Sequence, residues 1–292
     1  MTAARVLLLT AVPALLGAQA TDNLFTWSGR LAQGQTLTIR HYNGPLDVRQ
    51  GTGDRVEFRA DRNSRRDGDV SFQVENVSGG VTICSVYRGR NICDEDRRRG
   101  WGREEGPPSV RLIVSLPAGV RLAANTGNGD VTVDRAGNDV EIRTGNGDVR
   151  ISMTAGQVDV TTGNGELDIE GATGPVRATT GNGRVTVGTT TGPVNVRTGN
   201  GEIDVRMRTL AANAGDMTFS TGNGKVLVAL PGNFAGELDA STGHGEFSSD
   251  FEIRVTGRLN PRHVRGTIGD GRSTQRLRLS SGNGRIELRK LN

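Results

Sequence analysis

The sequence contains 292 residues, of which 43 are glycine and only 4% are aromatic. Glycine at this density without a collagen triplet predicts many tight turns, and the lack of long stretches rich in Ala, Leu, Glu and Lys excludes a helical bundle. The net charge of +4 comes almost entirely from arginines interleaved with acids, which indicates a mixed solvated surface and no nucleic-acid partner.

Residues 1–20 have the organisation of a secretory signal peptide. Arg5 supplies a positive n-region, residues 6–17 an apolar core, and Ala18-Gln19-Ala20 a small-x-small cleavage pattern. The apolar core is too short to span a bilayer. We expect cleavage after Ala20, export to the periplasm, cell envelope or extracellular space, and no transmembrane segment in the mature chain.

Residues 21–119 are predicted to form the first strands and the cap of a larger β-structure. Residues 37–48 have a strand, Asn-Gly turn, strand order, and further strands are expected at 55–60, 70–77 and 81–87. Cys84 and Cys93 are nine residues apart in an exported chain, which suits a disulfide that closes a short hairpin. A redox pair is the alternative, but the C-x-x-C spacing is missing.

A polar loop follows the second cysteine. It contains Arg97, Arg98 and Arg99, with Trp101 close behind them. A solvated loop is the simpler interpretation. The functional one is a contact for an anionic envelope polymer or a partner protein, with the tryptophan as its apolar anchor.

Residues 120–292 carry the strongest pattern in the chain, a recurring Thr-Gly-Asn-Gly turn. The turn recurs first every 18 residues and then at longer steps, with His replacing Asn once and Ser replacing Thr once, at Thr126, Thr144, Thr162, Thr180, Thr198, Thr221, Thr242 and Ser281. A fixed period of this length indicates a solenoid.

Each period contains two pairs of apolar residues spaced two apart. In the first period these are Val131 with Val133, and Val140 with Ile142. Such spacing places the apolar side chains on one face of a strand and polar ones on the other. The sequence therefore predicts an all-β fold, a parallel β-solenoid (β-helix) of about 18 residues per coil, with two flattened sheets and an N-terminal cap bearing the disulfide hairpin.

The turn asparagines are expected to form a structural ladder along the stack. Asparagine tolerates the left-handed backbone conformation and can hydrogen-bond to its equivalent in the next coil, roughly 4.8 Å away. The ladder comprises Asn128, Asn146, Asn164, Asn182, Asn200, Asn223 and Asn283.

The C-terminal part departs from the regular period. Residues 261–272 are predicted to be irregular. The final strand, residues 285–290, alternates charged with aliphatic side chains, which predicts an edge strand protected against pairing with another molecule.

Acidic residues after the turns are weak calcium candidates. Asp130, Asp148 and Glu166 follow successive turns, and stacked carboxylates could share a cation. The chain lacks the G-G-x-G-x-D calcium repeat, and Arg184 follows in the same row, so ordinary charge pairing along a solvated corner is the competing interpretation. No cofactor and no assigned metal site are expected.

An enzyme is the alternative from another class, since carbohydrate-active enzymes also use β-helices. The acids Asp159, Asp168 and Asp204 are separated by other residue types, and a narrow coil leaves little room for a cleft. The three histidines form no local cluster. No catalytic residue is predicted.

Several turn and strand motifs together resemble a known family. They are Trp27-Ser28-Gly29, Gly34-Gln35-Thr36-Leu37, Asn43-Gly44, Leu116-Pro117-Ala118-Gly119-Val120 before the first repeat, and Arg265-Gly266-Thr267-Ile268-Gly269 before the last. Over residues 22–292 the chain resembles the bacterial domain-of-unknown-function family labelled "putative adhesin", and is similar to head-GIN-domain auto-transporter adhesins. The resemblance implies an exported β-solenoid of the cell envelope, without catalytic residues to carry over.

We therefore expect a non-enzymatic, adhesin-like binding or scaffolding module. Its expected partner is an envelope polysaccharide or a surface protein, met through many weak contacts on a rigid body. A carbohydrate-active enzyme and a calcium-stabilised rod are the alternatives. The oligomeric state does not follow from the sequence.

Overall fold

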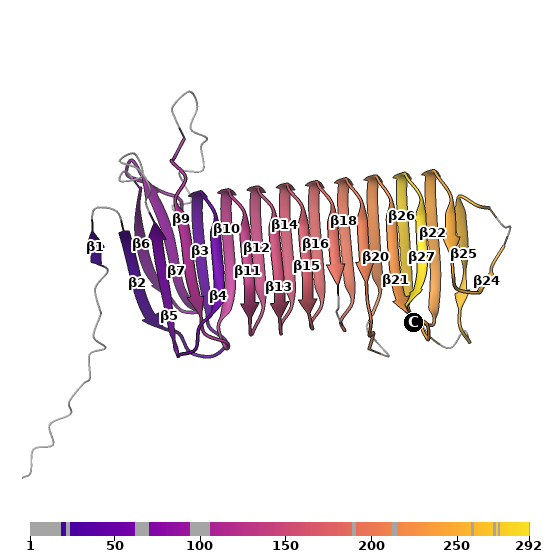
Figure 1. Cartoon of the computed structure of the whole chain (residues 1–292), viewed down its shortest axis with the longest axis horizontal. Helices are drawn as coiled ribbons and strands as arrows, with labels where there is room; N and C mark the ends of the chain where they lie inside the picture. Colours follow the sequence, from indigo (N-terminus) through magenta and orange to yellow (C-terminus); the bar gives the residue numbers. More distant parts are fainter. Residues whose placement is uncertain are drawn as a thin grey trace, which may run out of the picture.

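The structure is a computed structural model that describes residues 19–21, 24–61, 70–93, 106–188, 191–211, 215–257, 260–270, 273 and 275–291. Throughout these residues the secondary structure is strand and turn, without a helix. Two sheets lie face to face and run the length of an elongated body, confirming the predicted all-β solenoid (Figure 1).

One sheet, which we call sheet A, contains 13 strands. In spatial order they are β1 (Gln19–Thr21), β2 (Leu24–Arg30), β5 (Arg55–Asp61), β9 (Arg111–Leu116), β4 (Leu46–Gln50), β11 (Val131–Ala136), β13 (Val149–Thr154), β15 (Leu167–Ala172), β17 (Val185–Gly188), β19 (Ile203–Arg206), β21 (Val226–Pro231), β27 (Ile286–Leu291) and β23 (Phe247–Ser249).

The other sheet, sheet B, contains 14 strands. In spatial order from the N-terminal end they are β6 (Val70–Val77), β7 (Gly80–Tyr87), β3 (Thr36–Asn43), β10 (Arg121–Asn128), β12 (Val140–Asn146), β14 (Val158–Asn164), β16 (Val176–Asn182), β18 (Val194–Asn200), β20 (Met217–Asn223), β26 (Arg276–Asn283), β22 (Gly236–His244), β25 (His263–Ile268) and β24 (Ile253–Val255), with β8 (Arg90–Asn91) paired beside β7.

The 18-residue period sets the register in both sheets. Val131 is opposite Val149 in the parallel pair β11–β13, and Val140 is opposite Val158 in β12–β14. Along each strand the apolar residues are buried between the sheets, while intervening side chains such as Glu141 reach solvent. The core is a narrow, mostly aliphatic layer, stabilised by burial of apolar surface on both sheets.

At the N-terminal end, chain order and spatial order differ. The first coil, β3 and β4, lies between the coil of β7 and β9 and the coil of β10 and β11. Strands β2, β5 and β6 pair antiparallel with their neighbours beyond this point. The rings of Phe25, Phe58 and Phe72 meet here with centroids 5.2–6.0 Å apart and close the end of the core.

The predicted disulfide joins Cys84 to Cys93, with their Cα atoms 5.9 Å apart. It closes the short antiparallel pair of β7 and β8. The turn between them contains Arg88 and Gly89, with φ of 50° and 73°. Glycine suits such a turn because it lacks the Cβ that makes positive φ unfavourable.

The C-terminal strand is not an edge strand, so this prediction is wrong. β27 pairs with β21 on one side and with β23 on the other, and β26 likewise lies between β20 and β22. The last coil of the chain is thus inserted between two earlier ones. The charged side chains of β27 form ion pairs with neighbouring coils on the outer face of sheet A, which explains the alternating charges.

Residues 261–272, predicted to be irregular, contain strand β25. This strand pairs antiparallel with both β22 and β24, and its Val264 and Ile268 are buried. The 18-residue pattern does not reveal β25 because it runs against the solenoid strands. The actual edges of sheet B are β6 and β24.

Candidate functional site

The turn corner carries a continuous ladder of exposed asparagines. Each Nδ2 donates to the Oδ1 of the asparagine in the preceding coil at 2.6–2.8 Å, joining Asn128, Asn146, Asn164, Asn182, Asn200, Asn223 and Asn283. An amide donates two hydrogens and accepts on two lone pairs. Each interior asparagine uses one donor and one acceptor within the ladder, which leaves polar capacity toward solvent along the corner.

The asparagines do not adopt the left-handed backbone, contrary to the sequence expectation. Among the described non-glycine residues only Arg88 has positive φ. In the turns from Thr126 to Thr221 the second glycine has positive φ instead, as at Gly147 with φ of 153°. A Cβ on Gly183 would lie 1.9 Å from the carbonyl oxygen of Gly165, so the coils can stack this closely only through glycine.

The turn threonines point into the body. Thr162 Oγ1 donates to the Gly147 carbonyl in the preceding coil at 3.2 Å. In the first coil His41 occupies this place, in register with Thr126. Sequence reasoning did not place His41 inside the body; alignment of residues 41–44 with the turn motif is the signal that would have done so.

His41 is a buried titratable residue that the sequence interpretation left without a role. It is 2% exposed, and its Nε2 lies 3.0 Å from the Val110 carbonyl oxygen. Burial lowers the pKa of His41 to about 4, and it outweighs the hydrogen bond to Val110, which raises the pKa. The neutral ring stacks beside Phe72 with centroids 6.0 Å apart, which makes it a structural part of the cap.

The calcium candidates lie in one row at the turn corner, and the carboxylates of Asp130 and Asp148 each accept a backbone amide. Asp130 Oδ1 accepts the Asp148 amide at 2.9 Å, and Asp148 Oδ1 accepts the Glu166 amide at 2.8 Å. They line a hollow of about 250 Å³ with Arg150 and Arg184. Over the described ranges no three His, Cys, Asp or Glu residues group in a way that could hold a metal ion.

The acids considered for an enzyme are not brought together. Asp159 lies on β14 of sheet B, whereas Asp168 and Asp204 lie on sheet A. Thr186 of β17 separates the two sheet A acids in the ladder. This placement provides no close carboxylate pair for acid and base catalysis at these positions.

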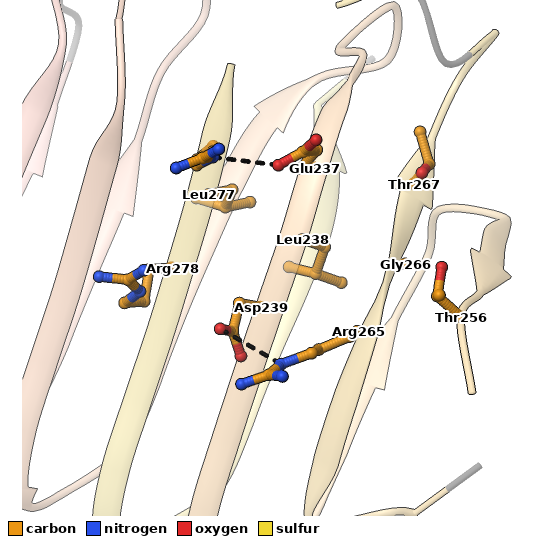
Figure 2. Close-up of a pocket in the computed structure, with 10 residues that line it drawn as sticks. Glu237, Leu238, Asp239, Thr256, Arg265, Gly266, Thr267, Leu277 and Arg278 are labelled. Carbon is orange, nitrogen blue, oxygen red and sulfur yellow. Dashed lines mark hydrogen bonds and ion pairs between the residues drawn. The ribbon is translucent and has the colours of Figure 1, made fainter. Parts of the chain in front are cut away.

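A second hollow, of about 320 Å³, lies on the outer face of sheet B near the C-terminal end (Figure 2). Arg276 pairs with Glu237 at 3.1 Å, and Arg265 Nε lies 3.5 Å from Asp239 Oδ2. Arg278 forms no ion pair with any described residue. The hollow therefore presents alternating charges with one guanidinium available to an anionic group.

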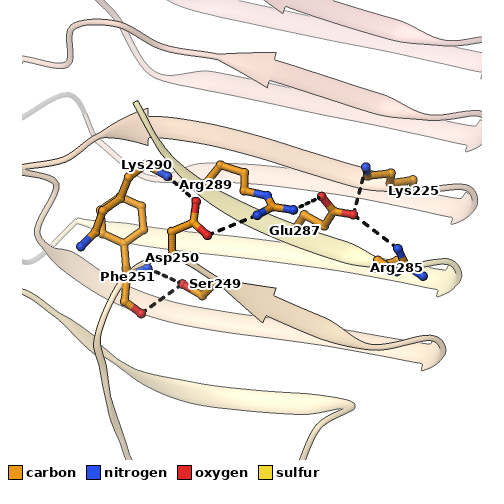
Figure 3. Close-up of polar contacts among 8 residues, drawn as sticks. All are labelled: Lys225, Ser249, Asp250, Phe251, Arg285, Glu287, Arg289 and Lys290. Carbon is orange, nitrogen blue, oxygen red and sulfur yellow. Dashed lines mark hydrogen bonds and ion pairs between the residues drawn. The ribbon is translucent and has the colours of Figure 1, made fainter. Parts of the chain in front are cut away.

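The outer face of sheet A carries an ion-pair network at the same end (Figure 3). Glu287, with its side chain 7% exposed, lies 3.0 Å from Lys225 and 3.0 Å from Arg289, while Arg285 is 3.8 Å away. The Lys225 hydrogen bond, aided by Arg289, lowers the pKa of Glu287. Arg289 also reaches Asp250 at 3.3 Å, so the network ties β27 to both neighbouring coils.

Arg97, Arg98, Arg99 and Trp101, suggested as a partner contact, lie outside the described residues. Where the structure is described, no helix is both long and apolar enough to cross a membrane.

These features define a class: a two-sheet β-solenoid with a buried, mostly aliphatic core and polar outer faces. Residues 104–287 match the Toastrack family, DUF4097. The chain belongs to this family. No curated protein matches it in sequence.

Solved structures similar to the chain include two named putative adhesins and one named putative lipid binding protein. The adhesin from Parabacteroides merdae is 10% identical, with 92% of this chain and 97% of that chain covered and a TM-score of 0.47. The adhesin from Bacteroides fragilis is 13% identical, covering 94% and 100%, at 0.41. The lipid binding protein from Parabacteroides distasonis is 12% identical, covering 90% and 96%, at 0.49.

Proposed function

We propose that this Toastrack protein is an exported, non-enzymatic binding or scaffolding module of the cell envelope. The observation that carries the proposal is the repetition of polar outward-facing side chains on a rigid two-sheet body. Equivalent positions recur roughly every 4.8 Å along the stack, so a polymeric or multivalent partner can be met by many weak contacts at once.

The distribution of charge favours an anionic partner near the C-terminal end. Residues 217–292 contain eleven Lys and Arg against seven Asp and Glu, whereas residues 121–216 contain nine against twelve. The hollow lined by Arg265, Arg276 and Arg278 lies in the basic part. An acidic envelope polysaccharide or an acidic patch of a surface protein would meet complementary charge there.

The test is co-sedimentation of the purified protein with cell-envelope fractions and with a defined acidic polysaccharide, polygalacturonate, in the presence and absence of chelator. The supernatant is assayed for released sugar. Saturable binding without sugar release supports the proposal. Release of sugar would favour the carbohydrate-active alternative, and binding lost on chelation would favour the calcium-stabilised rod.

Two matched substitutions locate the contact. Arg278→Gln removes the guanidinium of the hollow that has no ion-pair partner among the described residues. Arg177→Gln removes an arginine at the equivalent outward position in the middle of sheet B. We expect weaker polysaccharide binding for Arg278→Gln and little change for Arg177→Gln. Equal effects of both would show that binding depends on overall charge, without a specific C-terminal contact.

A further inference from the structure

The two edge strands of sheet B leave backbone groups without a strand partner among the described residues. β6 pairs only with β7, and β24 only with β25, within the described ranges. They lie at opposite ends of the body (Figure 1). β6 is eight residues long with one charged residue, Glu75, and β24 has one, Arg254. Neither strand contains the proline or lysine that commonly protects an edge.

The core also ends in partly exposed apolar side chains on these two strands. Phe72 and Val74 of β6, and Ile253 of β24, pack against the core while remaining only partly buried. Val255 of β24 is 39% exposed. An edge of this kind gains stability when another strand covers it.

Strand direction allows the two edges to join head to tail. β7 is parallel to the solenoid strands of sheet B, and β6 is antiparallel to β7. β25 is antiparallel to β22, and β24 is antiparallel to β25. β24 is therefore parallel to the solenoid strands of sheet B. In two copies stacked end to end, β24 of one therefore meets β6 of the next in antiparallel orientation.

One register satisfies both charge and packing. Placing Glu75 opposite Arg254 puts Val74 opposite Val255 and Asn76 opposite Ile253, because positions in an antiparallel pair advance in opposite directions. Val74 and Val255 both face the inner side of sheet B, where the core lies. Glu75 and Arg254 both face outward, and neither forms an ion pair with a described residue of its own chain.

The backbone groups agree with the same register. Thr256 N–H donates to Arg265 O at 2.8 Å, so by alternation Ile253 and Val255 direct their amide and carbonyl groups to the free edge. Val77 and Gly80 close the β6–β7 hairpin through a two-residue turn, which leaves Val74 and Asn76 directed to the other free edge. The unused groups thus face each other.

We propose that β24 of one molecule pairs with β6 of a second copy, so that the protein assembles head to tail into rods. The partner is the same chain because its two edges complement each other in direction, register and charge. Tail-to-tail pairing through β24 would instead place Arg254 against Arg254. A head-to-tail contact whose rotation does not close a ring produces filaments, and end-to-end stacking of these elongated bodies is such a contact. This proposal is independent of the proposed adhesin-like function.

The test measures the mass of the purified protein by sedimentation velocity over a concentration series, with electron microscopy of the concentrated sample. We expect mass to increase with concentration and particles to lengthen at constant width. A monomer at every concentration, or sideways bundles in place of single rods, would overturn the proposal.

Charge reversal tests the register. Glu75→Arg and Arg254→Glu alone are each expected to weaken association about threefold to tenfold, since like charges would face each other. The double variant, and an equimolar mixture of the two single variants, should restore it, because each then pairs Arg with Glu. Weakening without restoration would contradict this register.

Val255→Lys places a charge at the apolar part of the junction and should abolish assembly. Met153→Lys is the matched control, because Met153 is 45% exposed but lies on β13 in the middle of sheet A. Circular dichroism and thermal unfolding check that each variant is folded. Equal loss of assembly for both lysine variants would point to nonspecific hydrophobic association and sink the proposal.

Discussion

At the scale of single residues, glycine decides how closely the coils can stack. In the turns from Thr126 to Thr221 the second glycine combines positive φ with a carbonyl of the neighbouring coil at the place where a Cβ would lie. Neither condition accepts a Cβ. By contrast, Gly188 of β17 has room, since a Cβ there would be 3.5 Å from the nearest atom, an ordinary contact.

These two glycines provide a matched pair of substitutions. Gly183→Ala should lower the free energy of unfolding by about 2–4 kcal/mol, because it adds backbone strain and a clash. Gly188→Ala should change it by less than about 1 kcal/mol. Urea unfolding followed by circular dichroism measures both. Comparable losses at the two positions would show that the turn geometry is not the cause.

His41 makes stability depend on pH. Its pKa is lowered to about 4 in the folded protein, against about 6.5 when unfolded. The unfolded chain therefore binds the proton first as pH falls. The contribution of the neutral His41 to the free energy of unfolding is fully present above pH 6.5. It declines as the pH falls from 6.5 to 4, by up to about 3 kcal/mol.

The measurement is urea unfolding at several pH values for the parent and for His41→Thr, which restores the residue of the equivalent turns. The difference between the two should shrink or reverse as the pH falls toward 4. A parallel decline in both proteins would assign the pH dependence to other groups.

At the scale of elements, the N-terminal cap combines antiparallel strands, a phenylalanine cluster and a disulfide. Caps are needed because a solenoid end exposes its core. The disulfide closes a loop of nine residues that begins on β7. β7 also pairs with β3 of the first coil. Reduction should therefore loosen the cap from the side of sheet B.

Replacing both cysteines by serine should lower the free energy of unfolding by about 2.5 kcal/mol, from the chain entropy of a loop of this length. Dithiothreitol should lower the thermal midpoint of the parent to a similar extent and leave the double-serine variant unchanged. If the double-serine variant had the same thermal midpoint as the parent, the cap would not need the crosslink.

The asparagine ladder acts across elements, since it joins successive strands of sheet B at their turn ends. Asn164→Ala removes its hydrogen bonds to Asn146 and Asn182. We expect a loss of about 1–2 kcal/mol, since each such bond contributes about 0.5–1.5 kcal/mol. Thr161→Ala, at an exposed position of the same strand, is the control for thermal unfolding. Equal thermal midpoints for Asn164→Ala and Thr161→Ala would show that the ladder does not stabilise the protein.

At the scale of the whole molecule, both ends of the body are interleaved. The first coil is enclosed by later parts of the chain, and the last coil is inserted between earlier ones. Coils at the two ends therefore depend on distant segments, unlike a simple repeat array in which each unit contacts only its chain neighbours.

Removing residues 276–292 tests this dependence. The deletion removes the buried Leu277, Leu279, Ile286 and Leu288 and separates β22 and β23 from the rest of the solenoid. We expect a lower thermal midpoint and rapid proteolysis between residues 232 and 275, while the repeats at 121–206 resist digestion. A truncated chain that keeps the parent midpoint would contradict the dependence.

Much of this architecture could be predicted from the sequence alone. The 18-residue period, the paired apolar residues and the turn motif specify parallel strands, their register and the inward side of each, because local spacing decides which face a side chain occupies. The asparagine ladder follows from the same period. The disulfide between Cys84 and Cys93 follows from the nine-residue separation of two cysteines in a chain expected to be exported.

Only the tertiary structure decided the order of the coils at the two ends. Chain order does not state where a late strand inserts, so residues 285–290 resembled an edge although β27 is enclosed by β21 and β23. It also decided which surfaces meet. The basic hollow and the surroundings of Glu287 join residues distant in sequence, and long-range packing, which no local pattern encodes, brings them together. The same packing leaves β6 and β24 as the edges of sheet B.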